Sequence, residues 1–84
     1  MKASTRLMRL RVYLIVFTSD DGLVHVRYEG GYVLDDKDDK VEALVSGCGL
    51  NFEEACESYL NKISGKRLRI YDPYTNDRRE VTVL

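Results

Sequence analysis

Residues 47–65 of this chain read GCGLNFEEACESYLNKISG and carry the signals of one complete helix. Asn51 is a good N-cap, because its side-chain oxygen can accept a hydrogen bond from a first-turn amide. Glu54 follows three residues later and completes a capping-box pattern. Gly65 is suited to the C′ position, since glycine adopts a left-handed conformation at little cost. These signals predict a helix between Asn51 and Gly65.

The apolar side chains between these caps recur at alternating spacings of three residues and one residue, which is typical of a helix buried along one side. They are Phe52, Ala55, Cys56, Tyr59, Leu60 and Ile63. The opposite side carries charged and polar residues. A single helix of about twelve residues is not stable alone in water, so we expect this helix to pack against a sheet.

Alternating apolar and polar residues predict strands on both sides of the helix. The expected strands are residues 7–17, 23–29 and 41–46 before the helix, and residues 67–71 and 79–84 after it. The order is therefore β-β-β-α-β-β. We predict an α+β fold in which an antiparallel sheet carries one helix on one face, and a single domain spanning residues 1–84.

The composition narrows the class of protein. With 44% hydrophobic and 32% charged residues, the chain is typical of a globular protein and not of a disordered one. A net charge of −1 argues against bulk electrostatic binding of nucleic acid or membranes. The apolar run 10–17 is too short to span a bilayer. Cys48 and Cys56 are interpreted as reduced thiols of a cytoplasmic protein.

The residue pattern predicts no catalytic residue, no metal site and no cofactor. The acidic stretch 35–40 lacks the ligand spacing of a calcium loop, and His25 is the only histidine, which excludes the usual zinc ligand sets. Residues 47–49 lack the further glycine and lysine of phosphate-binding loops, so we interpret them as a sharp strand-to-helix turn. A thiol enzyme in which His25 activates Cys48 is the third functional alternative.

Arginines and tyrosines gather on the predicted strands and turns and form the predicted partner-binding residues. They are Arg9, Arg11, Tyr13, Arg67, Arg69, Tyr71, Tyr74, Arg78 and Arg79. Because such side chains on a sheet can also stack bases and follow phosphates, an RNA- or DNA-binding module is the second functional alternative.

Residues 29–55 resemble the core of HicB-type antitoxin domains. Residues 49–55 match the family's Gly-x-Thr-x-Glu-Glu-Ala stretch, with Asn51 where the family usually has threonine. The resemblance implies three strands, a helix and a further strand. The chain departs from it by ending in the strand pair 67–84, without the DNA-binding motif that operator binding requires. Residues 63–81 also resemble small uncharacterised phage and prophage proteins, several of which block a host enzyme.

Both resemblances imply protein binding and not catalysis. The second face of the predicted first strand carries Arg9, Arg11, Tyr13, Ile15 and Phe17, and is too apolar to be fully solvated. An exposed apolar sheet face marks an interaction site, so a homodimer is expected as well as a protein partner. The sequence thus predicts a small non-enzymatic protein-binding domain, of the phage or toxin–antitoxin type, that inhibits its partner.

Overall fold

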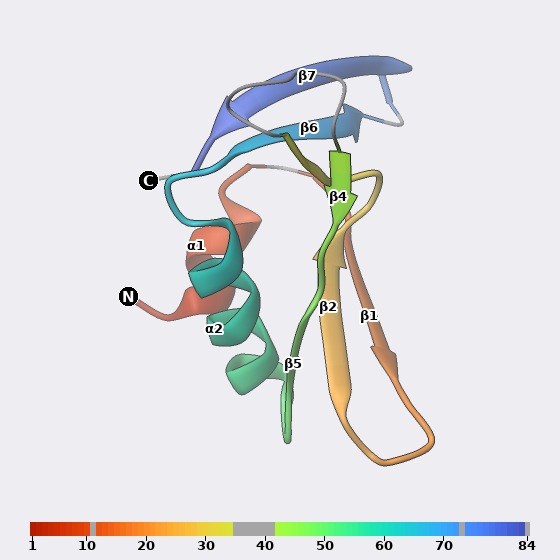
Figure 1. Cartoon of the computed structure of the whole chain (residues 1–84), viewed down its shortest axis with the longest axis vertical. Coiled ribbons are helices and arrows are strands. Elements are labelled where there is room, and N and C mark those ends of the chain that lie inside the picture. The colour runs from red at the N-terminus through yellow and green to blue at the C-terminus, as the bar shows by residue number, and fades with distance from the viewer. Residues whose placement is uncertain (11, 35–41, 73, 84) are drawn as a thin grey trace.

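The computed structural model describes residues 1–10, 12–34, 42–72 and 74–83. It is an α+β structure whose strand pairs are all antiparallel, which confirms the predicted class (Figure 1). The elements follow one another as α1 (Ala3–Met8), β1 (Leu14–Thr18), β2 (Val24–Tyr28), β3 (Tyr32–Leu34), β4 (Glu42–Leu44), β5 (Gly47–Gly49), α2 (Phe52–Ile63), β6 (Arg67–Asp72) and β7 (Asp77–Thr82).

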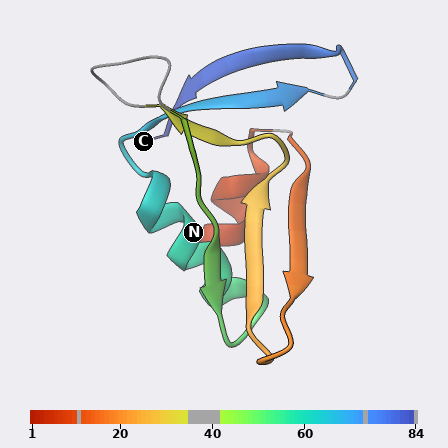
Figure 2. The same cartoon turned by 45° about the vertical axis from the view of Figure 1, so that its right-hand side comes forward.

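The strands form two sheets and not the single sheet that was predicted. The first sheet has the order β1-β2-β5 and the second has the order β4-β3-β6-β7. The second sheet crosses one end of the first, above the helices (Figures 1 and 2). The chain bends into the second sheet at Gly30, where φ is +64° and a Cβ atom would come within 2.9 Å of the Tyr71 Cβ. Only glycine fits this bend without strain.

The central helix α2 forms where its caps predict it. The Asn51 side chain accepts a hydrogen bond of 2.9 Å from the Glu54 amide, and Gly65 has a left-handed φ of +75°. The Glu54 carboxylate accepts from the amide of Leu50, one residue before the cap, and so differs from the usual capping box. The buried residues of α2 are Ala55, Cys56, Tyr59, Leu60 and Ile63, which confirms the predicted stripe except at Phe52, which is partly buried.

Residues 47–49 are a strand and not the sharp turn that was predicted. They form β5, which pairs with β2 and lies directly under α2. A Cβ atom on Gly47 would lie 2.2 Å from the Tyr59 amide nitrogen and 2.3 Å from the Ala55 carbonyl oxygen. The glycines are therefore needed because the helix backbone rests on the strand backbone, a contact that any side chain would prevent.

The predicted strand 7–17 is wrong over its first half. Residues 3–8 form α1, and β1 begins only at Leu14. Ala3 and Leu7, one helical turn apart, are buried against α2, and the Ser4 amide donates a hydrogen bond of 3.3 Å to the Glu53 carboxylate. Tertiary packing thus decides the conformation of a segment too short to form a helix alone.

Two tyrosines join the three layers of the core. Tyr28 of β2 and Tyr59 of α2 make an edge-on ring contact, with centroids 5.6 Å apart. The Tyr59 hydroxyl accepts from the Tyr28 amide at 3.0 Å, and the Tyr28 hydroxyl donates to the carbonyl of Leu7 in α1. Both side chains are buried with every polar atom satisfied.

Within the described ranges, no helix has the length and apolar content needed to cross a bilayer.

Candidate functional site

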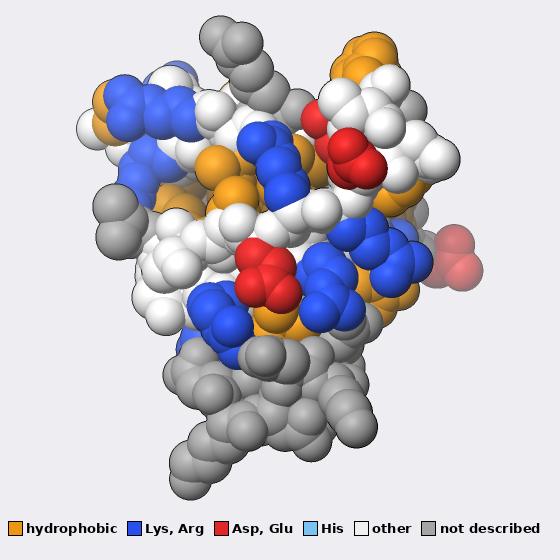
Figure 3. All heavy atoms as spheres, turned by 90° about the horizontal axis from the view of Figure 1, so that it is seen from above, with side chains coloured by type: hydrophobic (Ala, Val, Ile, Leu, Met, Phe, Trp, Pro, Cys, Tyr) orange, Lys and Arg blue, Asp and Glu red, His pale blue; other side chains and the backbone are white. Residues whose placement is uncertain are grey.

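Most of the arginines on the strands of the second sheet lie on its outer face, which is directed away from α2. Along β6, Leu68 and Ile70 are fully buried, so the alternating residues Arg67, Arg69 and Tyr71 lie on the opposite face. Figure 3 views the molecule from this side and shows Lys and Arg side chains spread over it, with acidic and hydrophobic patches between them.

Neighbouring strands extend this face in register. Arg69 pairs with Tyr32 of β3 on one side and with Glu80 of β7 on the other, and Tyr32 in turn pairs with Leu44 of β4. Cross-strand partners share one face of a sheet, so these residues form a continuous row. We call this surface the basic face; it comprises Tyr32, Leu44, Arg67, Arg69, Tyr71, Arg78 and Glu80.

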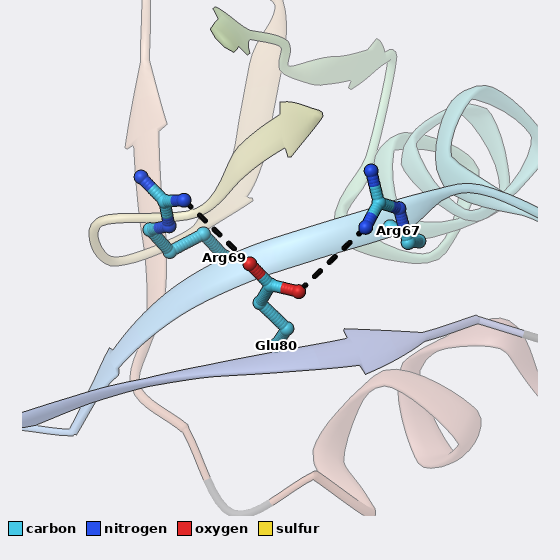
Figure 4. Close-up of polar contacts among 3 residues, drawn as sticks. All are labelled: Arg67, Arg69 and Glu80. Atoms are coloured by element: carbon cyan, nitrogen blue, oxygen red, sulfur yellow. Dashed lines mark ion pairs between the residues drawn. The ribbon is translucent and has the colours of Figure 1, made fainter. Parts of the chain in front are cut away.

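Glu80 lies between two arginines of the basic face (Figure 4). Its carboxylate oxygens are 3.8 Å from an Arg67 nitrogen and 3.6 Å from an Arg69 nitrogen. All three side chains are partly exposed, so these ion pairs contribute little to stability. Their effect is geometric: one carboxylate holds two guanidinium groups on the same face.

A hollow of about 380 Å³ opens beside this row, where the β2–β3 turn meets the sheet. Its lining residues are Glu29, Gly30, Tyr32, Arg69, Ile70, Tyr71 and Arg78. Arg78 lies opposite Tyr71 in the β6–β7 register, so two guanidinium groups and two phenol rings converge on the hollow. Such a site can bind a carboxylate or another planar anion by paired hydrogen bonds and can pack an apolar group against the rings.

The structure brings together four of the predicted partner-binding residues: Arg67, Arg69, Tyr71 and Arg78. Tyr13 and Tyr74 lie elsewhere, where their ring centroids are 5.4 Å apart and their hydroxyls share a hydrogen bond. This hydrogen bond is the main cause of a raised Tyr13 pKa. The tyrosine pair ties the segment before β1 to the β6–β7 turn.

The remaining predicted residues have other surroundings. Arg79 pairs with the buried Ile70, and its guanidinium donates a hydrogen bond of 2.7 Å to the Leu10 carbonyl, so it holds the segment after α1. Arg9 caps the C-terminal end of α1. Arg11 lies outside the described residues. Sequence reasoning missed Tyr32, Leu44 and Glu80, which join the basic face through strand pairing alone.

His25 and Cys48, the residues of the thiol-enzyme alternative, are direct partners between β2 and β5. The imidazole stacks on Phe17 with ring centroids 4.8 Å apart, and its Nε2 lies 3.0 Å from the Ser19 hydroxyl. The described residues hold no group of three or more His, Cys, Asp or Glu side chains that could bind a metal ion. The calcium-loop stretch 35–40 lies outside them.

The two cysteines are expected to differ sharply in reactivity. Cys48 is exposed, whereas Cys56 is buried and burial raises its pKa to about 11. Because only the thiolate is alkylated, iodoacetamide at about pH 8 should add one group to the folded protein, at Cys48, and a second only in denaturant. Mass spectrometry of timed samples checks this. The Cys48→Ser variant should stay unmodified while folded, and equal rates at both cysteines would contradict the buried position of Cys56.

Comparison with known proteins found no match for this chain: no family model, no curated protein and no solved structure is similar to it at a significant level.

Proposed function

We propose that this protein is a non-enzymatic binding domain that holds an acidic, partly apolar segment of a protein partner on its basic face. The observation that carries the proposal is the convergence of Arg69, Arg78, Tyr32 and Tyr71 on one hollow of about 380 Å³. Arginine forks match carboxylates in pairs of parallel hydrogen bonds, and tyrosine supplies rigid contact area. Blocking a partner enzyme, as the resemblance to small phage and prophage proteins implies, belongs to the same proposal.

The balance of charge and apolar surface favours a protein over a nucleic acid. Tyr32 and Leu44 of the basic face are 37% and 50% exposed, which gives the face an apolar part next to its arginines. Glu80 already offsets part of the positive charge. With a net charge of −1, the chain lacks the strong positive field that usually attracts a phosphate backbone.

Single-stranded nucleic acid is the second candidate, because Tyr32 and Tyr71 both lie on the basic face beside arginines. Aromatic rings on a sheet can stack bases, and each such stack contributes roughly 1–3 kcal/mol. Binding of this kind weakens steeply as salt is added, whereas a mixed polar and apolar peptide contact weakens less. Salt dependence therefore separates the two candidates.

The test is fluorescence anisotropy with a short labelled peptide of alternating Glu and Phe, and with labelled single-stranded oligothymidylate. The peptide should bind the natural chain, and the double variant Arg69→Gln, Arg78→Gln should weaken this binding at least about tenfold, or about 1.4 kcal/mol, because both guanidinium groups line the hollow.

The control is the double variant Lys2→Gln, Arg27→Gln, which removes the same formal charge outside the basic face and should leave peptide binding nearly unchanged. Equal weakening in both double variants would show that only net charge matters and would contradict the proposed site. Tighter, strongly salt-dependent binding of the oligonucleotide would favour the second candidate over the first.

A further inference from the structure

Strand β1 is an edge strand without any charged residue. It ends the sheet order β1-β2-β5 and reads LIVFT. Edge strands of monomeric proteins are usually protected against pairing with other chains by charged side chains, proline or bulges. Strand β7, at the edge of the second sheet, follows this rule, because it carries Asp77, Arg78, Arg79 and Glu80. Strand β1 lacks this protection.

The free edge of β1 presents backbone groups in the correct alternation for another strand. The Glu29 amide donates to the Tyr13 carbonyl at 2.9 Å, and the Ser19 amide donates to the Leu23 carbonyl at 2.9 Å. In an antiparallel pair every second residue bonds to its neighbour. Residues 14, 16 and 18 therefore direct their amide and carbonyl groups away from β2, where Figures 1 and 2 show no described strand or helix.

Two apolar side chains along this edge are about half exposed. Val16 is 48% exposed and Phe17, on the opposite face of the sheet, is 47% exposed. Helix α2 packs over β5 and β2, farther from this edge, so it leaves the Val16 side of β1 open. Apolar surface on both faces of an unpaired edge is typical of a strand that another strand covers.

We infer that β1 pairs antiparallel with β1 of a second copy, about a two-fold axis at Val16. Val16 then lies opposite the partner's Val16, Leu14 opposite the partner's Thr18, and Ile15 opposite the partner's Phe17. Each of these pairs is uncharged, and residues 14, 16 and 18 bond to one another across the axis. The two three-stranded sheets join into one continuous sheet.

A second copy fits this edge because the strand is complementary to itself. A two-fold axis requires that the same residues face each other in reverse order, and LIVFT does so without placing like charges together. The basic face belongs to the other sheet and shares no residue with β1. Self-association is therefore independent of the proposed partner binding, and each can fail without the other.

Disulfide trapping tests the register. Hydrogen-bonded antiparallel partners have Cα atoms about 5.5 Å apart, within the range that a disulfide spans. In a Cys48→Ser background, Val16→Cys should form a covalent dimer under mild oxidation with oxidised glutathione. Ile15→Cys and Phe17→Cys should each cross-link poorly alone but should cross-link to one another when the two variants are mixed. Equal cross-linking at all three positions would overturn the proposed register.

Sedimentation velocity tests the dimer without added cysteines. The natural chain should sediment as a dimer, and Val16→Lys should convert it to a folded monomer, as judged by circular dichroism, because two lysines would meet on the axis. The control Leu50→Lys places the same charge at a loop residue that is 77% exposed and should remain dimeric. A monomeric natural chain, or a dimer that persists in Val16→Lys, would overturn the inference.

Discussion

Replacing Gly47 with alanine is expected to lower the free energy of unfolding by at least about 3 kcal/mol. The added Cβ atom would lie 2.2 Å from the Tyr59 amide nitrogen and 2.3 Å from the Ala55 carbonyl oxygen, both on the backbone of α2. A side chain can rotate away from a clash, but a helix backbone can give way only if α2 moves off β5. That movement would separate the buried face of α2 from the first sheet.

Urea denaturation followed by circular dichroism measures this loss. For a domain of 84 residues the total stability is on the order of 4–13 kcal/mol, so the variant should be greatly weakened or unfolded. Gly65→Ala is the matched control: its φ is +75° but no atom lies within 4 Å of the added Cβ, so it should cost only about 1–2 kcal/mol. Gly47 has no left-handed φ, so equal losses in both variants would contradict the helix contact as the reason for glycine at this position.

Raising the pH from about 9 to about 11 is expected to destabilise the folded protein by on the order of 2–3 kcal/mol. The cause is Cys56. Burial raises the pKa of its thiol from the ordinary value of 9.0 to about 11. In this range the unfolded chain loses the thiol proton while the folded chain keeps it. The free energy of unfolding therefore falls as the pH rises, and the stability from this group is complete only below about pH 9.

Two buried tyrosines act in the same direction at higher pH. Burial raises the pKa of Tyr28 and of Tyr59 above the ordinary value of 10.0, so both resist ionisation while the protein is folded. Urea titrations at closely spaced pH values, in the presence of a reductant, measure the combined effect.

The variant Cys56→Ala separates the thiol from the tyrosines. It should lose about 1 kcal/mol at neutral pH through the small cavity that it leaves, but its stability should then fall less between pH 9 and 10 than that of the natural chain. A natural chain whose stability is constant from pH 9 to 11 would contradict the buried, protonated state of Cys56.

Local signals explain why α2 was predictable. Its N-cap, its C′ glycine and its apolar stripe all depend on residues no more than four positions apart, and each appears in the structure at the predicted residue. The alternation of Leu68 and Ile70 with Arg67, Arg69 and Tyr71 is equally local, so the arginine-bearing side of β6 was also predictable.

Local pattern misled where distant residues decide the conformation. The apolar residues before β1 suit a strand as well as a helix, and only the packing of Ala3 and Leu7 against α2 makes residues 3–8 helical. Residues 47–49 look like a turn because glycine is common in turns, yet here glycine allows two backbones to touch. Nothing in the neighbouring sequence distinguishes the two uses.

The candidate site also depends partly on local sequence pattern and partly on contacts between residues far apart in the chain. The sequence by itself determined the central helix and the arginines along β6, because spacing along one segment governs both of them. Only the tertiary structure assigned Arg78 to the basic face and Arg79 to a bond with Leu10, and only strand pairing added Tyr32, Leu44 and Glu80. The physical reason is that register joins residues far apart in the chain, and a shift of one residue moves every side chain to the other face.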